Sequence, residues 1–215
     1  MSSVQTLLLR EQFSNPQQQR DSSTLGMWIF MATEVMFFGG LFAAYAIYRM
    51  YYTRGFEEGA EGMTLLIGSI NTVVLMTSCL TMSLAIRAIS QNKQAQTYWM
   101  LILTNLLGVL FLVLKFTEYI QHYHEHKAPG VWFISHKPEA GAEQMFFVFY
   151  FAMTGLHAIL MTIGIGLVTA IAVRTAMGRF NAEYHTPVSI VGLYWHFVDI
   201  IWTFLYVIFY IPGFH

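Results

Sequence analysis

Long apolar segments alternate with short polar ones along most of the chain. About 20 residues at a helical rise of 1.5 Å cross the hydrocarbon core of a bilayer, and five segments reach that length. The pattern predicts an all-α membrane protein, an up-and-down bundle of five transmembrane helices. Short connections favour antiparallel neighbours. The predicted spans are 25–48, 63–86, 98–118, 145–173 and 188–211.

The domain organisation follows from the same pattern. Residues 1–23 form a polar N-terminal segment, and residues 24–215 form a single five-helix transmembrane domain. The chain starts without an apolar core, so we expect the first span, rather than a cleaved signal peptide, to direct insertion. Basic residues number six on the N-terminal side and four on the other, which favours a cytoplasmic N-terminus and an outside C-terminus. The six are Arg10, Arg20, Arg87, Lys93, Arg174 and Arg179, and the four are Arg49, Arg54, Lys127 and Lys137.

Composition supports a membrane protein. Of the residues 56% are hydrophobic and 11% are charged, whereas soluble domains carry about 25% charged residues. The net charge of -1 gives no electrostatic attraction to nucleic acid. Cys79 is the single cysteine, which excludes an intrachain disulfide and a multi-cysteine metal cluster. We expect it to be a small buried apolar residue.

Glu34 is an acidic residue near the middle of the first span. An unpaired carboxylate at that depth costs several kcal/mol, so we expect it to be protonated or paired. It could serve as a proton relay, as an acid that contacts a lipid headgroup or another helix, or as an ion ligand. The structural alternative is an acid hydrogen-bonded to a neighbouring helix. Gly39 and Gly40 follow it, and such small residues allow another helix to approach closely.

Histidines lie deep in the last two spans. His196 and Asp199 are three positions apart and share a helix face, so Asp199 is predicted to accept a hydrogen bond from the His196 ring. His157 is predicted to contact Glu34 or Glu118, and it is more typical of a hydrogen-bonded residue than of a metal ligand. With only two deep histidines, the chain itself is not expected to hold haem or copper.

Glu118 closes the third span and is followed by His122, His124 and His126. His122 and His126 are four positions apart and would share a helix face if the helix continues, which leaves a zinc or copper site as one hypothesis. Their position at the membrane boundary favours a solvated interfacial face instead. Lys115, near the end of the same span, is expected to extend its ammonium group towards the interface.

These residues occur in ordered motifs that resemble the cytochrome c oxidase subunit III family of haem-copper oxidases. The motifs appear in the family's order from about residue 25 to residue 210, and the ordered set is far more specific than any one motif. Leu193–Trp202 resembles the family's final helix, and Trp28–Phe42 resembles the helix that carries its membrane-embedded glutamate. Ser69–Thr72, Thr117–Tyr119 and Thr154–His157 resemble the three helices between them.

The resemblance implies a non-redox subunit of a respiratory oxidase that couples oxygen reduction to proton pumping. Such a subunit belongs to an oxidoreductase complex but has no catalytic centre, cofactor or metal of its own; the haems and copper are expected in partner subunits. It implies packing against catalytic subunit I, association with subunit II, bound phospholipid, and support for proton uptake and active-site stability in a bacterial cytoplasmic membrane. Supporting structural or proton-related roles fall on Glu34, Glu118, His157, His196 and Asp199, and a lipid contact falls on Arg179.

Other functions remain open. A related subunit of a quinol oxidase or nitric oxide reductase complex would share the bundle, because the electron donor is recognised by a different subunit. An independent proton channel or transporter with Glu34 as its relay is the remote alternative. Haem types, lipid identity and membership of a larger respiratory assembly also stay open. The chain is similar to the five-helix bacterial form rather than the seven-helix mitochondrial one, and it has Leu160 and Ser189 where the family often has histidine and glutamate.

Overall fold

The computed structural model describes residues 15–130, 133–134 and 138–212. All regular secondary structure in these ranges is helical, and five of the helices are long and apolar enough to cross a membrane. The predicted fold class is therefore confirmed, and each predicted span falls on a different long helix; residues 63–64 of the second span and 210–211 of the fifth lie just outside their helices. The helices are α2 (Pro16–Tyr51), α3 (Thr53–Glu61), α4 (Leu65–Ser90), α5 (Gln94–His124), α6 (Ala140–Ala176) and α7 (Thr186–Phe209).

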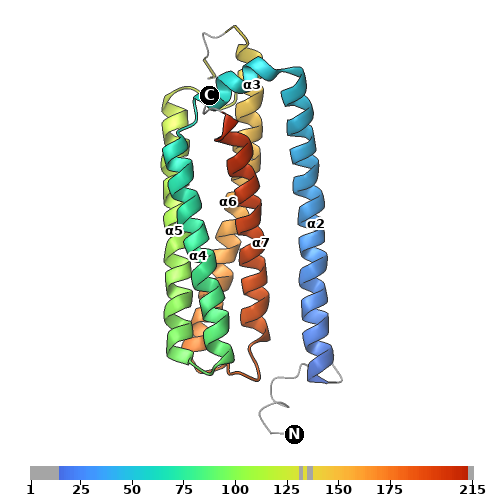
Figure 1. Ribbon diagram of the computed structural model, residues 1–215, viewed down its shortest axis with the longest axis vertical. Coiled ribbons are helices and arrows are strands. Elements are labelled where there is room, and N and C mark those ends of the chain that lie inside the picture. The colour runs from blue at the N-terminus through green and yellow to red at the C-terminus, as the bar shows by residue number, and fades with distance from the viewer. Residues whose placement is uncertain (1–14, 131–132, 135–137, 213–215) are drawn as a thin grey trace.

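The long helices run up and down along one axis (Figure 1). Helices α4 to α7 form the bundle, and α2 stands at its edge beside α7. Within the most apolar part of each helix, 56% of the residues of α7 are buried but only 11% of those of α2. Helix α7 is therefore a central element of the fold, whereas α2 exposes most of its surface to whatever surrounds the protein in the membrane.

Helix α2 begins well before the apolar segment that predicted it. The Asn15 side chain accepts a hydrogen bond from the backbone N–H of Gln18 (2.7 Å) and so caps the first turn. Residues 16–23 of the predicted polar segment are thus helical, while residues 1–14 lie outside the described residues. Hydropathy marks only the apolar part of a helix, and here the cap decides where the helix starts.

Helix α3 was not predicted. Its buried residues, Gly55, Phe56, Gly59 and Ala60, recur on one face, which packs against the start of α6. A Cβ atom added to Gly55 would lie 2.3 Å from Cβ of Ala142, and one added to Gly59 would lie 2.6 Å from the Phe146 ring. The two glycines therefore allow this short helix to lie directly on α6.

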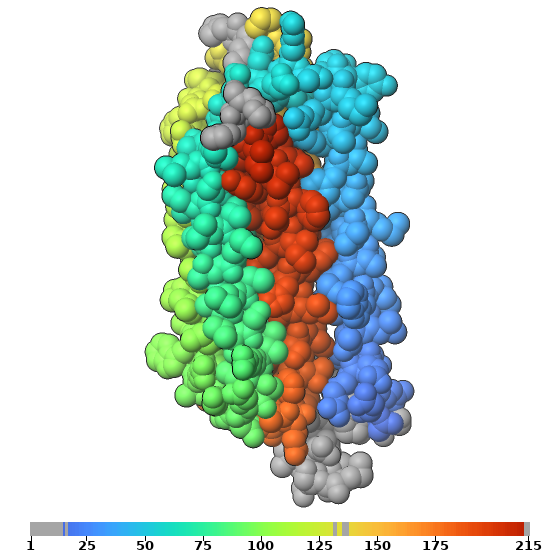
Figure 2. Space-filling view, viewed as in Figure 1, coloured from blue at the N-terminus to red at the C-terminus, as the bar shows by residue number. Residues whose placement is uncertain are grey.

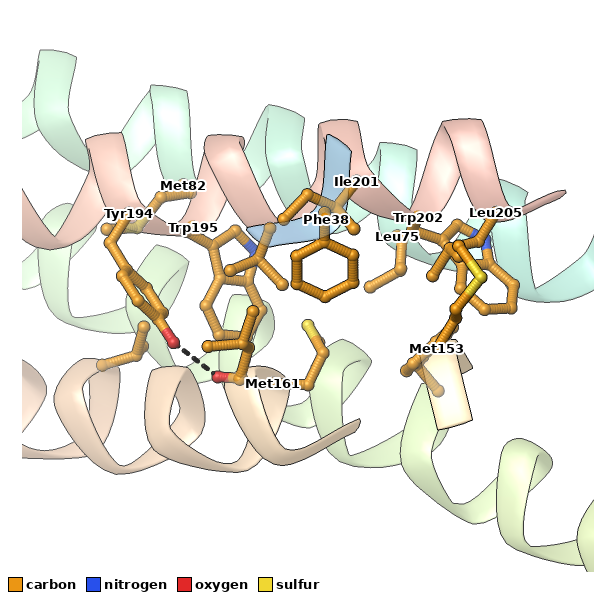
Figure 3. Close-up of a cluster of buried hydrophobic side chains, with 14 of the residues drawn as sticks. Phe38, Leu75, Met82, Met153, Met161, Tyr194, Trp195, Ile201, Trp202 and Leu205 are labelled. Carbon is orange, nitrogen blue, oxygen red and sulfur yellow. Dashed lines mark hydrogen bonds between the residues drawn. The ribbon is translucent and has the colours of Figure 1, made fainter. Parts of the chain in front are cut away.

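Large aromatic side chains of α7 fill the centre of the bundle. Trp195 and Trp202 are fully buried, and Figure 3 shows both indoles among apolar side chains of α4 and α6. The Trp195 Nε1 donates to Ser78 Oγ (2.8 Å), and the Trp202 Nε1 donates to Thr72 Oγ1 (3.1 Å), so each indole N–H has a partner on α4. A Cβ atom added to Gly108 of α5 would lie 2.7 Å from the Trp195 ring.

Gly39 and Gly40 do not meet another helix within the described part of this chain. Both residues are exposed on α2, and a Cβ atom added to either would have no atom within 4 Å. The buried face of α2 carries Met31, Phe38 and Tyr45 instead. No described helix approaches α2 over these glycines, because α2 meets the bundle with its opposite face.

Candidate functional site

A buried ion pair between Lys115 and Glu118 joins three elements at the end of the bundle where α7 finishes. Lys115 is only 2% exposed, and its Nζ donates to Glu118 Oε2 (2.9 Å). The same ammonium group donates to the hydroxyls of Tyr150 (2.9 Å) on α6 and Tyr210 (2.8 Å), which caps α7. Tyr210 in turn donates to Glu118 Oε1 (2.6 Å). Each charge therefore has several partners, which buried ions require.

Lys115 does not extend to the interface as expected. Its ammonium group instead lies among aromatic rings, 4.8 Å from the Tyr150 ring centre and 5.2 Å from that of Trp202. Cation–π attraction strengthens when the pair is shielded from water, so these rings add to the stabilisation of the charge. A lysine three residues before a glutamate in an apolar helix was the sequence signal for this pair, since such residues share a helix face.

The three histidines after Glu118 are separated by the end of α5. His122 is buried on the inner face, 4.0 Å from Glu118 Oε1 and 3.8 Å from Glu125 Oε2, and neither ring nitrogen has a hydrogen-bond partner. His124 and His126 are exposed. The helix ends at His124 and His126 has a φ of 54°, so the helix does not continue and His122 and His126 do not share a helix face.

No metal centre is formed by these histidines in the described part of the chain. No group of three or more His, Cys, Asp or Glu residues there is arranged to hold a metal ion. Just beyond α5, Lys127 donates a hydrogen bond to Glu125 over a 2.7 Å contact, and this bond lowers the pKa of Glu125 below its usual value. The interface at this end of α5 is thus a small set of charged pairs.

His157 is fully buried in α6 and surrounded by aromatic rings. Its ring centre lies 5.6 Å from that of Phe111 and 5.4 Å from that of Trp202. Neither ring nitrogen has a hydrogen-bond partner, so the predicted contact with Glu34 or Glu118 is not formed. Its described contacts are therefore with aromatic rings, and a buried polar group left unpaired costs about 1–3 kcal/mol.

The predicted hydrogen bond between His196 and Asp199 is also wrong. His196 Nδ1 lies 2.9 Å from Cys79 Sγ and Nε2 lies 3.2 Å from Ser83 Oγ, both on α4. Asp199 is buried and lies close enough to Cys79 to interact with its thiol, but neither carboxylate oxygen meets hydrogen-bond geometry. Sharing a face was not sufficient, because α4 lies against that face and supplies nearer partners. Cys79 is accordingly half-buried and polar in its contacts.

Glu34 is half-buried on α2, on the side that faces α7. Tyr194 of α7 is one of the groups that Glu34 influences electrostatically, and no hydrogen bond joins these two described side chains. The Tyr194 hydroxyl donates a hydrogen bond to the backbone carbonyl of Leu160 (2.7 Å), which Figure 3 shows as a dashed line. Glu34 therefore lies where α2 meets the bundle, near a tyrosine whose hydroxyl is already bonded to α6.

Arg179 lies in the connection between α6 and α7, and its side chain is exposed. This connection and the turn between α4 and α5, which holds Lys93, lie at the same end of the molecule as the start of α2 (Figure 1). Exposed basic side chains at the end of a bundle can reach phosphate groups of lipids. The position is compatible with the lipid contact expected from the sequence.

A family model and three known proteins that are similar to this chain carry the same description. The family model described as cytochrome c oxidase subunit III matches residues 14–214. Cytochrome c oxidase subunit 3 of Thermostichus vulcanus is 31% identical over 195 residues, which cover 89% of this chain and 88% of that protein. The Synechocystis protein of the same description is 28% identical over 192 residues (89% and 76%), and the human one is 29% identical over 188 residues (85% and 66%).

Proposed function

The chain belongs to the cytochrome c oxidase subunit III family, and from this premise we propose that it is a non-redox subunit of a respiratory haem-copper oxidase. In this proposal it packs against catalytic subunit I in a complex that also contains subunit II. Those partners hold the haems and copper, which supply the oxygen chemistry. This chain binds phospholipid and supports proton uptake and active-site stability. It lies in a bacterial cytoplasmic membrane with its N-terminus in the cytoplasm and its C-terminus outside.

Buried polar groups hydrogen-bond one another between the helices, and this observation supports a scaffold role most directly. The Lys115–Glu118 pair joins α5 to α6 and to the end of α7 through two tyrosine hydroxyls. Trp195 joins α7 to α4 in the same way. These groups satisfy one another inside the chain, and their contacts fix the relative positions of four helices. A rigid bundle of this kind suits a subunit that holds a catalytic neighbour in place.

Glu34 is our candidate for proton-related support. It lies near the middle of an apolar helix, half-buried, where an ionised carboxylate without partners is costly. Tyr194, a polar side chain of α7 that Glu34 influences, already donates its hydroxyl hydrogen to the carbonyl of Leu160. We propose that the Glu34 carboxyl group takes up and releases a proton within the membrane.

Arg179 is our candidate for lipid binding. Its exposed side chain can hold a lipid phosphate at the end of the bundle.

Co-purification tests the proposal. The tagged chain would be isolated from its native membrane in a mild detergent, and its partners identified by mass spectrometry and a visible absorption spectrum. We expect large haem-bearing subunits and reduced-haem absorption bands. The partners' identity separates cytochrome c oxidase from quinol oxidase and nitric oxide reductase complexes. A colourless, monodisperse preparation of this chain alone would contradict the proposal and favour an independent membrane protein.

Substitution of Glu34 by glutamine tests its role within the complex. We expect unchanged haem content and initial activity but several-fold faster loss of activity during turnover, because the amide cannot exchange a proton. Glu57→Gln, on the exposed side of α3, is the matched control and should behave like the unaltered protein. Equal inactivation kinetics for the Glu34 variant and the control across a broad pH range would rule out the proton-related role.

A further inference from the structure

One strip of α7 stays exposed although most of this helix is buried. His196, Ile200, Thr203 and Val207 recur every three or four residues and therefore lie on one side of the helix. We call these four residues the α7 stripe. Ile200 is 56% exposed, even though its neighbours Asp199 and Ile201 are buried. The stripe is thus an uncovered part of an otherwise central helix.

The α7 stripe lies between two other helices. On one side, His196 and Trp202 contact α4 through Cys79 and Thr72. On the other side, the Tyr45 hydroxyl of α2 donates to the backbone carbonyl of Ile208 (2.9 Å). Figure 2 shows the same arrangement as a strip of α7 visible between α4 and α2. Helices α4 and α2 flank the α7 stripe but do not cover it, so a further helix has room to contact it.

A polar group of side chains interrupts this face close to the middle of α7. His196 is half-buried in the central part of α7, and it contacts Ser83, which is exposed on α4. Asp199 is buried beside Cys79 and lies close enough to interact with its thiol, although neither carboxylate oxygen meets hydrogen-bond geometry. Lipid chains offer no hydrogen bonds, and ionisable side chains at this depth normally face protein or water. Such a face is therefore suited to contact with protein rather than with lipid.

We propose that a transmembrane helix of the catalytic subunit lies along the α7 stripe between α4 and α2 and donates a side-chain hydrogen bond to Ser83. This inference rests on the proposed function, since it assigns the face through which the chain meets that subunit. The chemistry favours a hydrogen-bond donor on the partner, because both His196 ring nitrogens already have partners on α4 whereas the exposed Ser83 hydroxyl keeps a lone pair. Ser83 donates its own O–H to the backbone carbonyl of Cys79 (3.0 Å). Apolar contacts to Ile200 and Val207 would complete the packing.

Photo-crosslinking in the intact oxidase tests the assignment. A benzophenone amino acid would replace Ile200, and a matched variant would carry it at Ile163 of α6, which is 51% exposed and lies outside the stripe. We expect the Ile200 variant to crosslink to the catalytic subunit and the Ile163 variant to do so at least tenfold less. Mass spectrometry of the adducts would identify each partner.

Each other outcome overturns the inference in a distinguishable way. Adducts of the Ile200 variant with lipid or with a second copy of this chain, together with Ile163 adducts to the catalytic subunit, would place the interface on another face and leave the proposed function standing. Absence of subunit adducts from both variants, with no haem-bearing partner in the purified sample, would remove the inference and the proposed function together.

A packing variant gives an independent measurement. Ile200→Trp adds bulk to the stripe, and an overpacked contact weakens association roughly tenfold. We expect the ratio of this chain to haem in the purified complex to fall by about that factor after washing, whereas Ile163→Trp should leave the ratio unchanged. Equal retention of both variants would contradict the proposed contact, provided that both chains accumulate normally in the membrane.

Discussion

Replacement of Glu118 by leucine would leave the Lys115 ammonium group without its carboxylate inside the bundle. Lys115 is 2% exposed, and of its three hydrogen-bond partners only Glu118 is charged. Removing one partner of a buried ion pair costs about 3–5 kcal/mol, because the remaining charge is left uncompensated. For a chain of this size each kcal/mol lowers the unfolding midpoint by about 2–4 °C, so we expect a fall of roughly 10 °C.

The double variant Lys115→Met/Glu118→Leu separates the charge effect from the loss of packing. It removes both charges and keeps side chains of similar volume, and such replacements are often neutral or stabilising. We therefore expect the double variant to recover most of the stability that Glu118→Leu loses. Lys93→Met is the control, since Lys93 is exposed in the turn before α5 and its replacement should change stability by less than about 0.5 kcal/mol.

Cys79 provides the assay. It is the single cysteine of the chain and is half-buried against His196, so a thiol-reactive fluorophore reports the loss of helix packing during heating. The measurement would use the full chain, purified in one detergent for all variants. The reasoning would be refuted if Glu118→Leu unfolded at the same temperature as the Lys93 control, or if the double variant were as unstable as the single one.

Two further variants test packing and hydrogen bonding in the same assay. Gly108→Ala should destabilise the bundle by about 1–3 kcal/mol, because the new Cβ would lie 2.7 Å from the Trp195 ring. The control is Gly166→Ala, which should be neutral or slightly stabilising because no atom lies within 4 Å of the new Cβ. Equal effects of the two variants on stability would contradict the packing argument. Ser83→Ala should cost about 1 kcal/mol by removing the partner of His196 Nε2, whereas no loss of stability would show that this contact contributes nothing.

The positions of the transmembrane helices could be predicted from the sequence because hydropathy is a local property. A run of apolar residues long enough to cross the bilayer must satisfy its backbone hydrogen bonds internally, and a helix does so whatever lies beside it. Most ends of the five predicted spans therefore lie within a few residues of the observed helix ends. The largest difference, at the start of α2, depends on the Asn15 cap and not on hydropathy.

The contacts of the candidate residues depended on the rotation and neighbours of each helix. His196 and Asp199 share a face, as their spacing requires, but α4 brings Cys79 and Ser83 to the His196 ring. Lys115 looked like an interfacial lysine by its position in the chain. It is buried because its side of α5 turns towards α6 and the end of α7, where Glu118 and two tyrosine hydroxyls lie.

The sequence by itself determined the all-α class, the five spans and the family resemblance, because these depend on composition along the chain and on the order of short motifs. Only the tertiary structure decided that α3 forms, that α2 lies at the edge, and which polar groups meet. Helix α3 is too short and polar to show a membrane signal, and its stability comes from packing on α6. Side-chain pairing likewise depends on helices far apart in sequence, and a single sequence carries no direct record of which helices become neighbours.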